Sequence, residues 1–353
     1  MNLTGLETPA LILDAKKFQK NIKSMQEILA GKTLKLRPHY KSHKCAQIAH
    51  LQMQSGAKGM TCAKLSEAID LADCGIEDIL IANQITEPKK IRRLADLAGD
   101  CRLTVCVDDA DNARALSKAA QAAGTTIHCY IEFEIGMERC GVTKPEEVLA
   151  LAKLIEELPH LEYDGVQAYA GHISHVEDEA LRLKMTKDNA KKIRDLLKLL
   201  SDNGLPAKEL SGGSTGTAQM KAAEGMYTEL QAGSYLFMDA VYKNCDLPFE
   251  NALFVYSTVV STRDDLTVVD AGVKTCGVDQ GMPAILDNAA REIVASEEHF
   301  QLHGLEKPLQ CGDKVWLVPG HCCSTVNLYD RIYVVSEGKV VDRIAITARG
   351  FGK

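Results

Sequence analysis

RPHYKSHK, residues 37–44, is the stretch around which the fold and the chemistry of this chain can be worked out. It follows an apolar-alternating run at residues 33–36 that predicts a β-strand. A lysine at the carboxyl end of a barrel strand lies where catalytic residues of such barrels gather. A lysine desolvated among other cations becomes a nucleophile able to form a Schiff base. A basic octapeptide by itself is more typical of a solvated loop.

Strand-like and helix-like segments alternate from about residue 10 to 245. Amphipathic segments such as 64–72, 148–158 and 185–200 separate the strands. Eight strands separated by helices imply a parallel sheet, and eight strands close a barrel. We therefore expect an α/β fold, a (β/α)8 TIM barrel. The predicted strands are 34–39, 59–62, 78–82, 103–107, 128–134, 165–169, 209–211 and 228–231.

The pattern changes after about residue 248. Short β-branched segments with turn signals between them are typical of an all-β domain, and no long helical pattern interrupts them. We expect the barrel at residues 9–247 and a smaller all-β C-terminal domain at 248–353, to which residues 1–8 are candidates to join. The predicted strands of this domain are 254–262, 266–270, 314–319, 331–335 and 343–348.

Composition excludes several classes of function. The length of 353 residues fits a barrel of about 250 residues with a further domain of about 100. The net charge of −7 argues against bulk binding of nucleic acid or a membrane surface. No apolar stretch approaches the roughly 18 residues that span a bilayer, and no signal peptide is expected. The 12 cysteines are then expected to be reduced thiols of a cytoplasmic protein.

A glycine-rich turn, SGGSTGT at residues 211–217, follows the seventh predicted strand. Its backbone N–H groups can form an anion-binding nest, at the place where barrel enzymes commonly bind phosphate. QAGSY at 231–235 ends the eighth strand and can add further N–H groups. The first strand adjoins the eighth, so Lys41 and the nest face each other around the barrel mouth. One cofactor needs both an amine and a phosphate nest: pyridoxal 5′-phosphate.

With these motifs the chain resembles the fold-type III pyridoxal-phosphate enzymes, the alanine racemase-like barrels. Within them it is similar to the D-threonine aldolase and D-serine dehydratase group, over essentially the whole chain. The motifs that carry the resemblance are TPALILD (8–14), RPHYKSHK, TCAKLSEA (61–68), EIGMERCGV (134–142), QAYAGHISH (167–175), GGSTGT (212–217), ELQAGSYLFMD (229–239), DAGVKT (270–275), EEH (297–299) and GHCCSTVNLYD (320–330).

The resemblance implies roles for individual residues around the cofactor. The Schiff-base lysine falls on Lys41, with Lys44 as a rival that the motif places as a flanking cation. Arg139 matches the arginine on the ring-hydroxyl side, and Tyr169 the residue beside the pyridine nitrogen. A tyrosine would not hold that nitrogen protonated, so other groups must share in stabilising a carbanion. The phosphate contacts are expected from Gly213, Thr215, Gly216, Gly233 and Ser234.

A third feature is the pair His321 and Cys323. Imidazole and thiolate suit zinc and similar divalent ions, although His-x-Cys alone is a weak motif. The resemblance implies that this pair holds a divalent metal near the cofactor, with water and substrate completing an open site. Zinc is preferred from the thiolate, whereas a carboxylate would suit manganese or magnesium.

A metal beside the substrate's β-carbon can bind a β-hydroxyl, so the expected substrate is a small D-3-hydroxy amino acid. Retro-aldol cleavage would give glycine and an aldehyde, while β-elimination would give a 2-oxo acid and ammonia. His175 matches the aldolases' proposed general base. Cys323 stands where aldolases usually carry aspartate and dehydratases cysteine. Because the residues around Cys323 (motif GHCCSTVNLYD) are more similar to those of aldolases, we favour the aldolase and keep the dehydratase as the alternative.

Two further readings remain open. A racemase would need two bases and no metal, against which the His321 and Cys323 pair argues. A non-catalytic pyridoxal-phosphate-binding homeostasis protein would lack the β domain. The resemblance also implies a homodimer, in which the β domain of one subunit closes the barrel mouth of the other.

Overall fold

The computed structural model describes residues 2–352, which form two compact units. The barrel unit comprises Gln26–Lys41, Ile48–Gly233 and the last residues from Phe351 on. The β unit comprises the residues up to Met25 together with Ser42–Gln47 and Ser234–Gly350. Six residues directly after Lys41 thus belong to the β unit, which no local pattern indicates. The domain boundary predicted at residues 247 and 248 stays a prediction.

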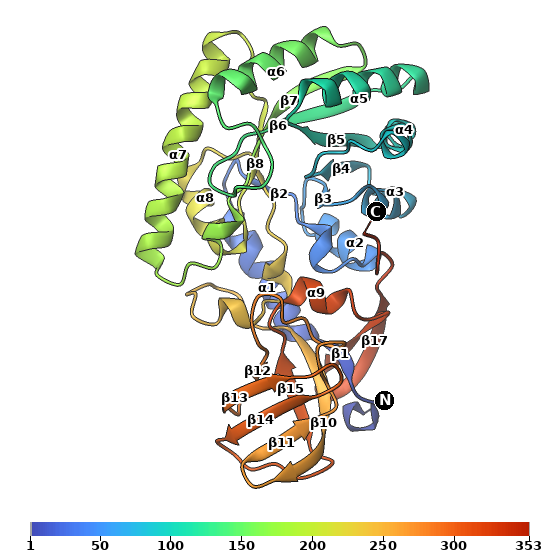
Figure 1. Cartoon of the computed structure of the whole chain (residues 1–353), viewed down its shortest axis with the longest axis vertical. Coiled ribbons are helices and arrows are strands. Elements are labelled where there is room, and N and C mark those ends of the chain that lie inside the picture. Colours follow the sequence, from blue (N-terminus) through green and yellow to red (C-terminus); the bar gives the residue numbers. More distant parts are fainter. Residues whose placement is uncertain (1, 353) are drawn as a thin grey trace. The chain divides into compact units, whose positions relative to one another are not determined.

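Within residues 2–352, the barrel sheet has eight parallel strands in the order β2-β9-β8-β7-β6-β5-β4-β3 (Figure 1). A bridge between His39 and Thr61 joins its two ends, so the sheet closes. The prediction of an eight-stranded α/β barrel is confirmed, with strand ends shifted by a few residues. The strands are β2 (Lys35–Leu36), β3 (Met60–Cys62), β4 (Asp78–Ile81), β5 (Arg102–Val107), β6 (Ile127–Glu132), β7 (Leu161–Ala168), β8 (Glu209–Gly212) and β9 (Glu229–Leu230).

Helices with one apolar face follow the barrel strands. In α7 (Glu179–Asp202), Ile193, Leu196 and Leu200 are buried, as their spacing along the sequence predicts. Asp178 caps this helix by accepting a hydrogen bond from the N–H of Leu181. The other helices up to the end of the barrel are α1 (Ala15–Leu29), α2 (Ala46–Gln54), α3 (Leu65–Asp73), α4 (Pro88–Leu97), α5 (Ala110–Ala123), α6 (Pro145–Glu157) and α8 (Ala218–Glu224).

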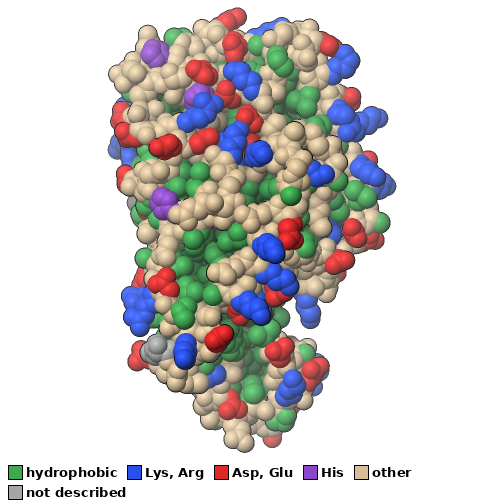
Figure 2. All heavy atoms as spheres, turned by 180° about the vertical axis from the view of Figure 1, so that it is seen from behind, with side chains coloured by type: hydrophobic (Ala, Val, Ile, Leu, Met, Phe, Trp, Pro, Cys, Tyr) green, Lys and Arg blue, Asp and Glu red, His purple; other side chains and the backbone are tan. Residues whose placement is uncertain are grey.

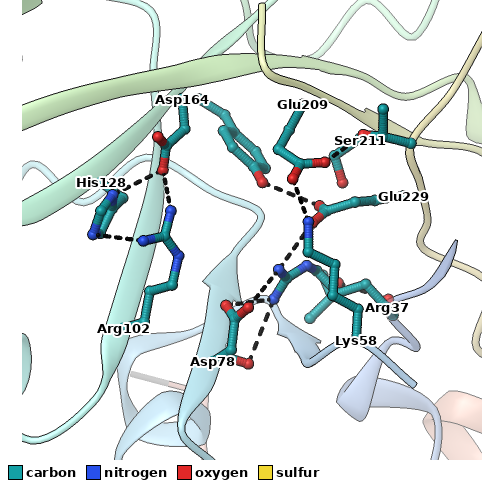
Figure 3. Close-up of polar contacts among 12 residues, drawn as sticks. Arg37, Lys58, Asp78, Arg102, His128, Asp164, Glu209, Ser211 and Glu229 are labelled. Carbon is teal, nitrogen blue, oxygen red and sulfur yellow. Dashed lines mark hydrogen bonds and ion pairs between the residues drawn. The ribbon is translucent and has the colours of Figure 1, made fainter. Parts of the chain in front are cut away.

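The barrel interior holds a buried ionic network (Figure 3). The Arg37 side chain is 2 % exposed, and its guanidinium binds both carboxylate oxygens of Asp78 at 2.9 and 3.0 Å. It also lies 2.9 Å from Glu229, which Lys58 approaches to 2.9 Å. Burial alone would lower the pKa of Arg37, but Glu229 and Asp78 raise it. A Cβ on Gly59 would lie 2.5 Å from the guanidinium, so this packing requires glycine there.

The β unit is built on one sheet in which β1 (Ala10–Asp14) pairs antiparallel with β10 and parallel with β16. The N-terminal strand therefore completes the C-terminal β structure. The five strands predicted after residue 248 are present, while β12, β13 and β14 are additional to the prediction. The strands are β10 (Leu253–Arg263), β11 (Leu266–Val269), β12 (Ala284–Ile285), β13 (Ala290–Ala295), β14 (Phe300–Leu305), β15 (Lys314–Val318), β16 (Arg331–Ser336) and β17 (Lys339–Ala345).

The core of the β unit contains aromatic pairs. Trp316 makes edge-to-face contacts with Phe254 and Tyr256, at centroid distances of 5.2 and 5.6 Å. A short helix, α9 (Cys322–Val326), follows β15. Side chains of both charges are interspersed on the face of the molecule in Figure 2. Among residues 2–352, no helix is both long and apolar enough to cross a membrane.

Candidate functional site

Lys41 lies in a 3-10 turn, η2 (Tyr40–Ser42), just beyond the first barrel strand. The Nδ1 atom of His39 accepts a hydrogen bond from the N–H of Lys41 at 3.4 Å. The buried Tyr40 donates from its hydroxyl to Asp70 at 2.5 Å, which anchors the turn to α3. These contacts place the lysine at the carboxyl end of a strand, where catalytic groups of barrels gather.

Three of the predicted site residues line one cavity of about 130 Å³ in the barrel unit: Lys41, Arg139 and Tyr169. The guanidinium carbon of Arg139 lies 5.8 Å from the centroid of the Tyr169 ring, within the range of a cation–π contact. The structure therefore brings together residues that are far apart in the sequence. The other lining residues are His39, Ala63, Ala82, Asn83, Gln167 and Gln231.

Amide side chains that sequence reasoning missed form part of this cavity. Gln231 donates from Nε2 to Gln167 at 2.9 Å and to Ser211 at 3.0 Å. Beside them, Gln84 donates to Glu132 at 2.7 Å. Burial raises the pKa of Glu132, and Gln84 lowers it only partly. The sequence signal that could have identified these amide residues is a polar residue at the carboxyl end of a barrel strand, at a position where an apolar residue would pack the barrel interior.

A pinned loop between β6 and α6 carries Arg139. Glu134 accepts hydrogen bonds from the backbone N–H groups of Gly136 and Glu138, at 2.6 and 2.8 Å. At the far end of the loop, Asp108 accepts from the N–H of Gly141 at 2.8 Å. Two carboxylates thus hold the backbone on either side of the arginine, so its side chain starts from a defined position.

The glycine-rich turn, predicted to hold a phosphate group, has a closely packed backbone. Gly213 has φ +74°, a left-handed conformation that favours glycine. The N–H of Ser214 donates to Oγ1 of Thr217 at 3.0 Å and closes the turn before η4 (Thr215–Thr217). A Cβ on Gly216 would lie 1.9 Å from the carbonyl oxygen of Ser174. Such a tight, glycine-dependent turn fits a phosphate group.

His321 and Cys323 bracket the start of α9 in the β unit. His321 is the residue before the helix, and its carbonyl oxygen accepts from Thr325 at 2.7 Å. Burial lowers the pKa of His321, but hydrogen bonds and charges from Cys323 and Asp279 outweigh it and raise that pKa to about 9. An imidazole and a thiol two residues apart at the start of one helix are a donor set that fits a divalent ion of zinc type.

Asp239, at the end of the ELQAGSYLFMD motif, supports this segment and was missed by sequence reasoning. Its carboxylate is 2 % exposed and accepts a hydrogen bond from the N–H of Cys322 at 2.9 Å. The next residue, Ala240, donates its N–H to the carbonyl of Pro319 at 2.9 Å. Burial raises the pKa of Asp239 to about 6. The backbone on both sides of His321 is therefore fixed by residues 239 and 240.

His175, the predicted base, lies in the barrel unit between η3 (Gly171–Ile173) and α7. In the described part of the chain it is not among the residues that line the 130 Å³ cavity. Its neighbour His172 packs against the Arg139 loop, since a Cβ on Gly136 would lie 3.1 Å from its Nε2. The role of His175 remains a prediction.

Two family models match the chain and together cover most of it. The model described as "Alanine racemase, N-terminal domain" matches residues 13–241. The one described as "Putative serine dehydratase domain" matches residues 252–335. The chain belongs to the alanine racemase-like, fold-type III family of pyridoxal-phosphate enzymes.

Relatives within this family include both aldolases and dehydratases. A D-threonine aldolase from Arthrobacter sp is 38% identical over 99% of this chain and 95% of its own. A 3-hydroxy-D-aspartate aldolase from Paracoccus denitrificans (strain Pd 1222) is also 38% identical, over 100% of this chain and 94% of its own. A D-threo-3-hydroxyaspartate dehydratase from Delftia sp. (strain HT23) is 28% identical, over 92% of each chain.

Solved structures also show a greater similarity to an aldolase than to a dehydratase. The D-threonine aldolase from Filomicrobium marinum superposes with a TM-score of 0.96 at 37% identity, covering 100% of this chain and 98% of that one. The Delftia dehydratase superposes with a TM-score of 0.88 at 25% identity, covering 98% of both chains. This family member is therefore an enzyme, a lyase, and the greater similarity to aldolases favours retro-aldol cleavage over dehydration.

A second group of residues that offers metal ligands is better explained as an ion-pair network (Figure 3). His128 lies 2.8 Å from Asp164 and 3.4 Å from Glu162. Arg102 contacts both His128 and Asp164, at 3.1 and 2.5 Å, and Lys208 lies 3.5 Å from Asp164. Arg102 and Lys208 already neutralise Asp164. The group also lies near the amino ends of its strands, whereas the active sites of such barrels lie at the carboxyl ends.

Proposed function

We propose that this family member is a pyridoxal-phosphate- and divalent-metal-dependent lyase that cleaves small D-3-hydroxy amino acids by a retro-aldol reaction, giving glycine and an aldehyde. The observation that carries the proposal is the cavity shared by Lys41, Arg139 and Tyr169, in a chain whose aldolase relatives are 38% identical to it.

The barrel unit supplies the residues that would hold the cofactor. Lys41 would bind its carbonyl carbon, Arg139 would face the ring hydroxyl, and Tyr169 would lie beside the pyridine nitrogen. Once bound, pyridoxal phosphate supplies an electron sink for charge that develops at the substrate's α-carbon. The phosphate would be held by Gly213, Thr215, Gly216, Gly233 and Ser234.

The cation of Arg139 would favour an ionised ring hydroxyl, while the neutral Tyr169 would leave the pyridine nitrogen unprotonated. The ring is then a weaker electron sink than one with a protonated nitrogen. Polar groups that line the cavity, such as Gln167 and Gln231, would orient the ring and its substituents by hydrogen bonds. With a weaker electron sink, groups near the substrate's β-carbon would have to contribute more to stabilising the charge that develops during cleavage.

His321 and Cys323 would hold the divalent ion, which supplies Lewis acidity for a β-hydroxyl when bound. His175 would accept the proton of that hydroxyl oxygen, so that the bond between the α- and β-carbons breaks. A solved structure of a D-threo-3-hydroxyaspartate dehydratase in which a cysteine is replaced by alanine is in the metal-free form, which supports a cysteine ligand in this group. The thiolate favours zinc over manganese or magnesium.

One experiment tests the proposal and its alternative together. The enzyme, loaded with pyridoxal phosphate and zinc, is incubated separately with D-threonine and D-serine, and the products are identified. Glycine and acetaldehyde from D-threonine support the aldolase. Pyruvate and ammonia from D-serine would support the dehydratase, the reading that Cys323 favours. Full activity after chelation of all metal would contradict both.

We also propose a homodimer, with the β domain of one subunit at the barrel mouth of the other, and a cytoplasmic location. The described cysteines are all free thiols, which suits a reducing compartment. Sedimentation equilibrium of the loaded enzyme tests the dimer, since a monomer at micromolar concentration would contradict it.

A further inference from the structure

We propose that Asp279 is a positioning residue for the metal: together with Ser324 it fixes the imidazole of His321 so that Nε2 is presented to the ion. This inference rests on the proposed function, because it concerns the metal that His321 and Cys323 would hold. Asp279 belongs to none of the motifs that identify the family in the sequence.

The carboxylate of Asp279 uses both of its oxygens near His321. Oδ2 lies 2.7 Å from Nδ1 of His321. Oδ1 accepts a hydrogen bond from Oγ of Ser324 at 2.5 Å. The same Ser324 hydroxyl lies 3.3 Å from the carbonyl oxygen of His321. The carboxylate cannot rotate without losing one of these contacts, so it holds the imidazole in a single orientation.

The loop that carries Asp279 is packed closely against α9. The N–H of Gly277 donates to Thr325 at 2.9 Å. A Cβ on Gly277 would lie 2.0 Å from Oγ of Ser324. On the other side, a Cβ on Gly320 would lie 1.8 Å from the carbonyl oxygen of Gly281. Two glycines thus allow an approach that larger residues would prevent, and this approach brings Asp279 to the histidine.

A carboxylate at Nδ1 has a definite chemical consequence. In a neutral imidazole either nitrogen can carry the proton, and only the other one has a lone pair for a metal. A hydrogen bond from Nδ1–H to Asp279 selects the tautomer whose lone pair is on Nε2. Metal-bound histidines generally have such a partner, whose loss weakens metal binding by about 10- to 100-fold.

The test measures metal binding directly. Protein loaded with pyridoxal phosphate is stripped of metal with a chelator, and zinc is titrated in competition with a chromogenic chelator. Asp279→Asn is expected to raise the zinc Kd by about 10- to 100-fold. Ser324→Ala is expected to raise it by about fivefold, the loss of one supporting hydrogen bond. Asp279→Glu, which restores a carboxylate, is expected to recover part of the affinity.

Asp265→Asn is the matched control. The Asp265 side chain is 56 % exposed against 54 % for Asp279, and it lies 3.9 Å from another histidine, His303. Its zinc Kd should equal that of the wild type. Thermal midpoints and cofactor absorbance, measured for every variant, separate a folding defect from a loss of metal.

Two outcomes distinguish this inference from the proposed function. A wild type that binds zinc tightly while Asp279→Asn binds within twofold of it overturns the role of Asp279 alone. A wild type that binds no divalent ion overturns the metal half of the proposed function and this inference with it. If Asp279→Asn does not fold, an unchanged Kd in Ser324→Ala still contradicts the inference.

Discussion

The sulfur of Cys323 lies 3.5 Å from Oγ of Ser42, the residue that directly follows Lys41 in the chain. Ser42 is 1 % exposed, and both residues belong to the β unit. The segment after the predicted Schiff-base lysine is therefore held by the structure that carries the predicted metal ligands. The same segment is also held at Lys44, whose carbonyl oxygen accepts a hydrogen bond from the N–H of Ala348 at 3.0 Å.

Replacing Lys41 by alanine tests the covalent attachment of the cofactor. Borohydride reduction followed by peptide mass spectrometry should place the label on Lys41 in the wild type. Lys41→Ala should lose activity by about a thousandfold or more, because it removes the nucleophilic amine. The control is Lys44→Ala, which should keep both the label and most of the activity. A label that moves with Lys44 instead would reverse the assignment.

Cys323→Asp exchanges a soft ligand for a hard one. We expect the ratio of the manganese Kd to the zinc Kd to fall by at least about tenfold, because carboxylates bind manganese and magnesium better than thiolates do. Both constants are measured by chelator competition on metal-stripped protein. Cys311→Ser, which changes an exposed thiol, should leave the ratio unaltered. An unaltered ratio in Cys323→Asp would remove Cys323 from the metal site.

Gly216→Ala adds a methyl group where the carbonyl oxygen of Ser174 lies 1.9 Å away. The backbone of the phosphate cradle must shift, and we expect the Kd for pyridoxal phosphate to rise about 10- to 100-fold, from an overpacking cost of about 1–3 kcal/mol. Fluorescence titration of the apoenzyme with the cofactor measures it. Gly5→Ala has open space around its Cβ and should bind like the wild type. Equal affinities would place the phosphate elsewhere.

Glu229→Gln removes one charge from the ionic network inside the barrel. The carboxylate is 0 % exposed and faces Arg37 and Lys58, so its loss removes one of the two carboxylates that neutralise the buried Arg37. We expect the free energy of unfolding at pH 7 to fall by about 3–5 kcal/mol, as measured by urea denaturation. Asp202→Asn breaks the exposed pair with Lys198 and should cost less than about 1 kcal/mol.

The same network should also affect how the free energy of unfolding changes at acidic pH. Burial would raise the pKa of Glu229, but Arg37 and Lys58 outweigh it and lower that pKa. The stabilisation that ionised Glu229 provides is therefore fully present above its pKa in the unfolded chain, about 4.3. It is lost as the pH falls through the lower pKa of Glu229 in the folded protein. The difference between wild type and Glu229→Gln should be constant from pH 7 to 5 and shrink below about pH 4. A difference that grows on acidification would contradict this assignment.

Local patterns in the sequence were enough to predict the eight-stranded barrel and to place Lys41 at its mouth, whereas Arg139 and Tyr169 were predicted there only from the resemblance to the family. Alternation of strands and helices depends on neighbouring residues, and parallel strands bring their carboxyl ends to one edge. Strand β13 escaped prediction because its side chains are largely exposed and show no clear period of two. In β14 the buried Phe300 and Leu302 do alternate with polar residues, but the alternation is confined to the first half of the strand.

The sequence by itself thus determined the class of fold, which follows from short-range periodicity, and its motifs predicted the residues that would meet the cofactor. Only the tertiary structure decided which polar side chains support them. Asp279 reaches His321 across 42 residues and Asp239 reaches Cys322 across 83. The pairing of β1 with β10 and β16 joins residues that are still farther apart in the chain. Hydrogen bonds of this kind depend on how loops and strands close in space, and no spacing along the chain encodes that closure.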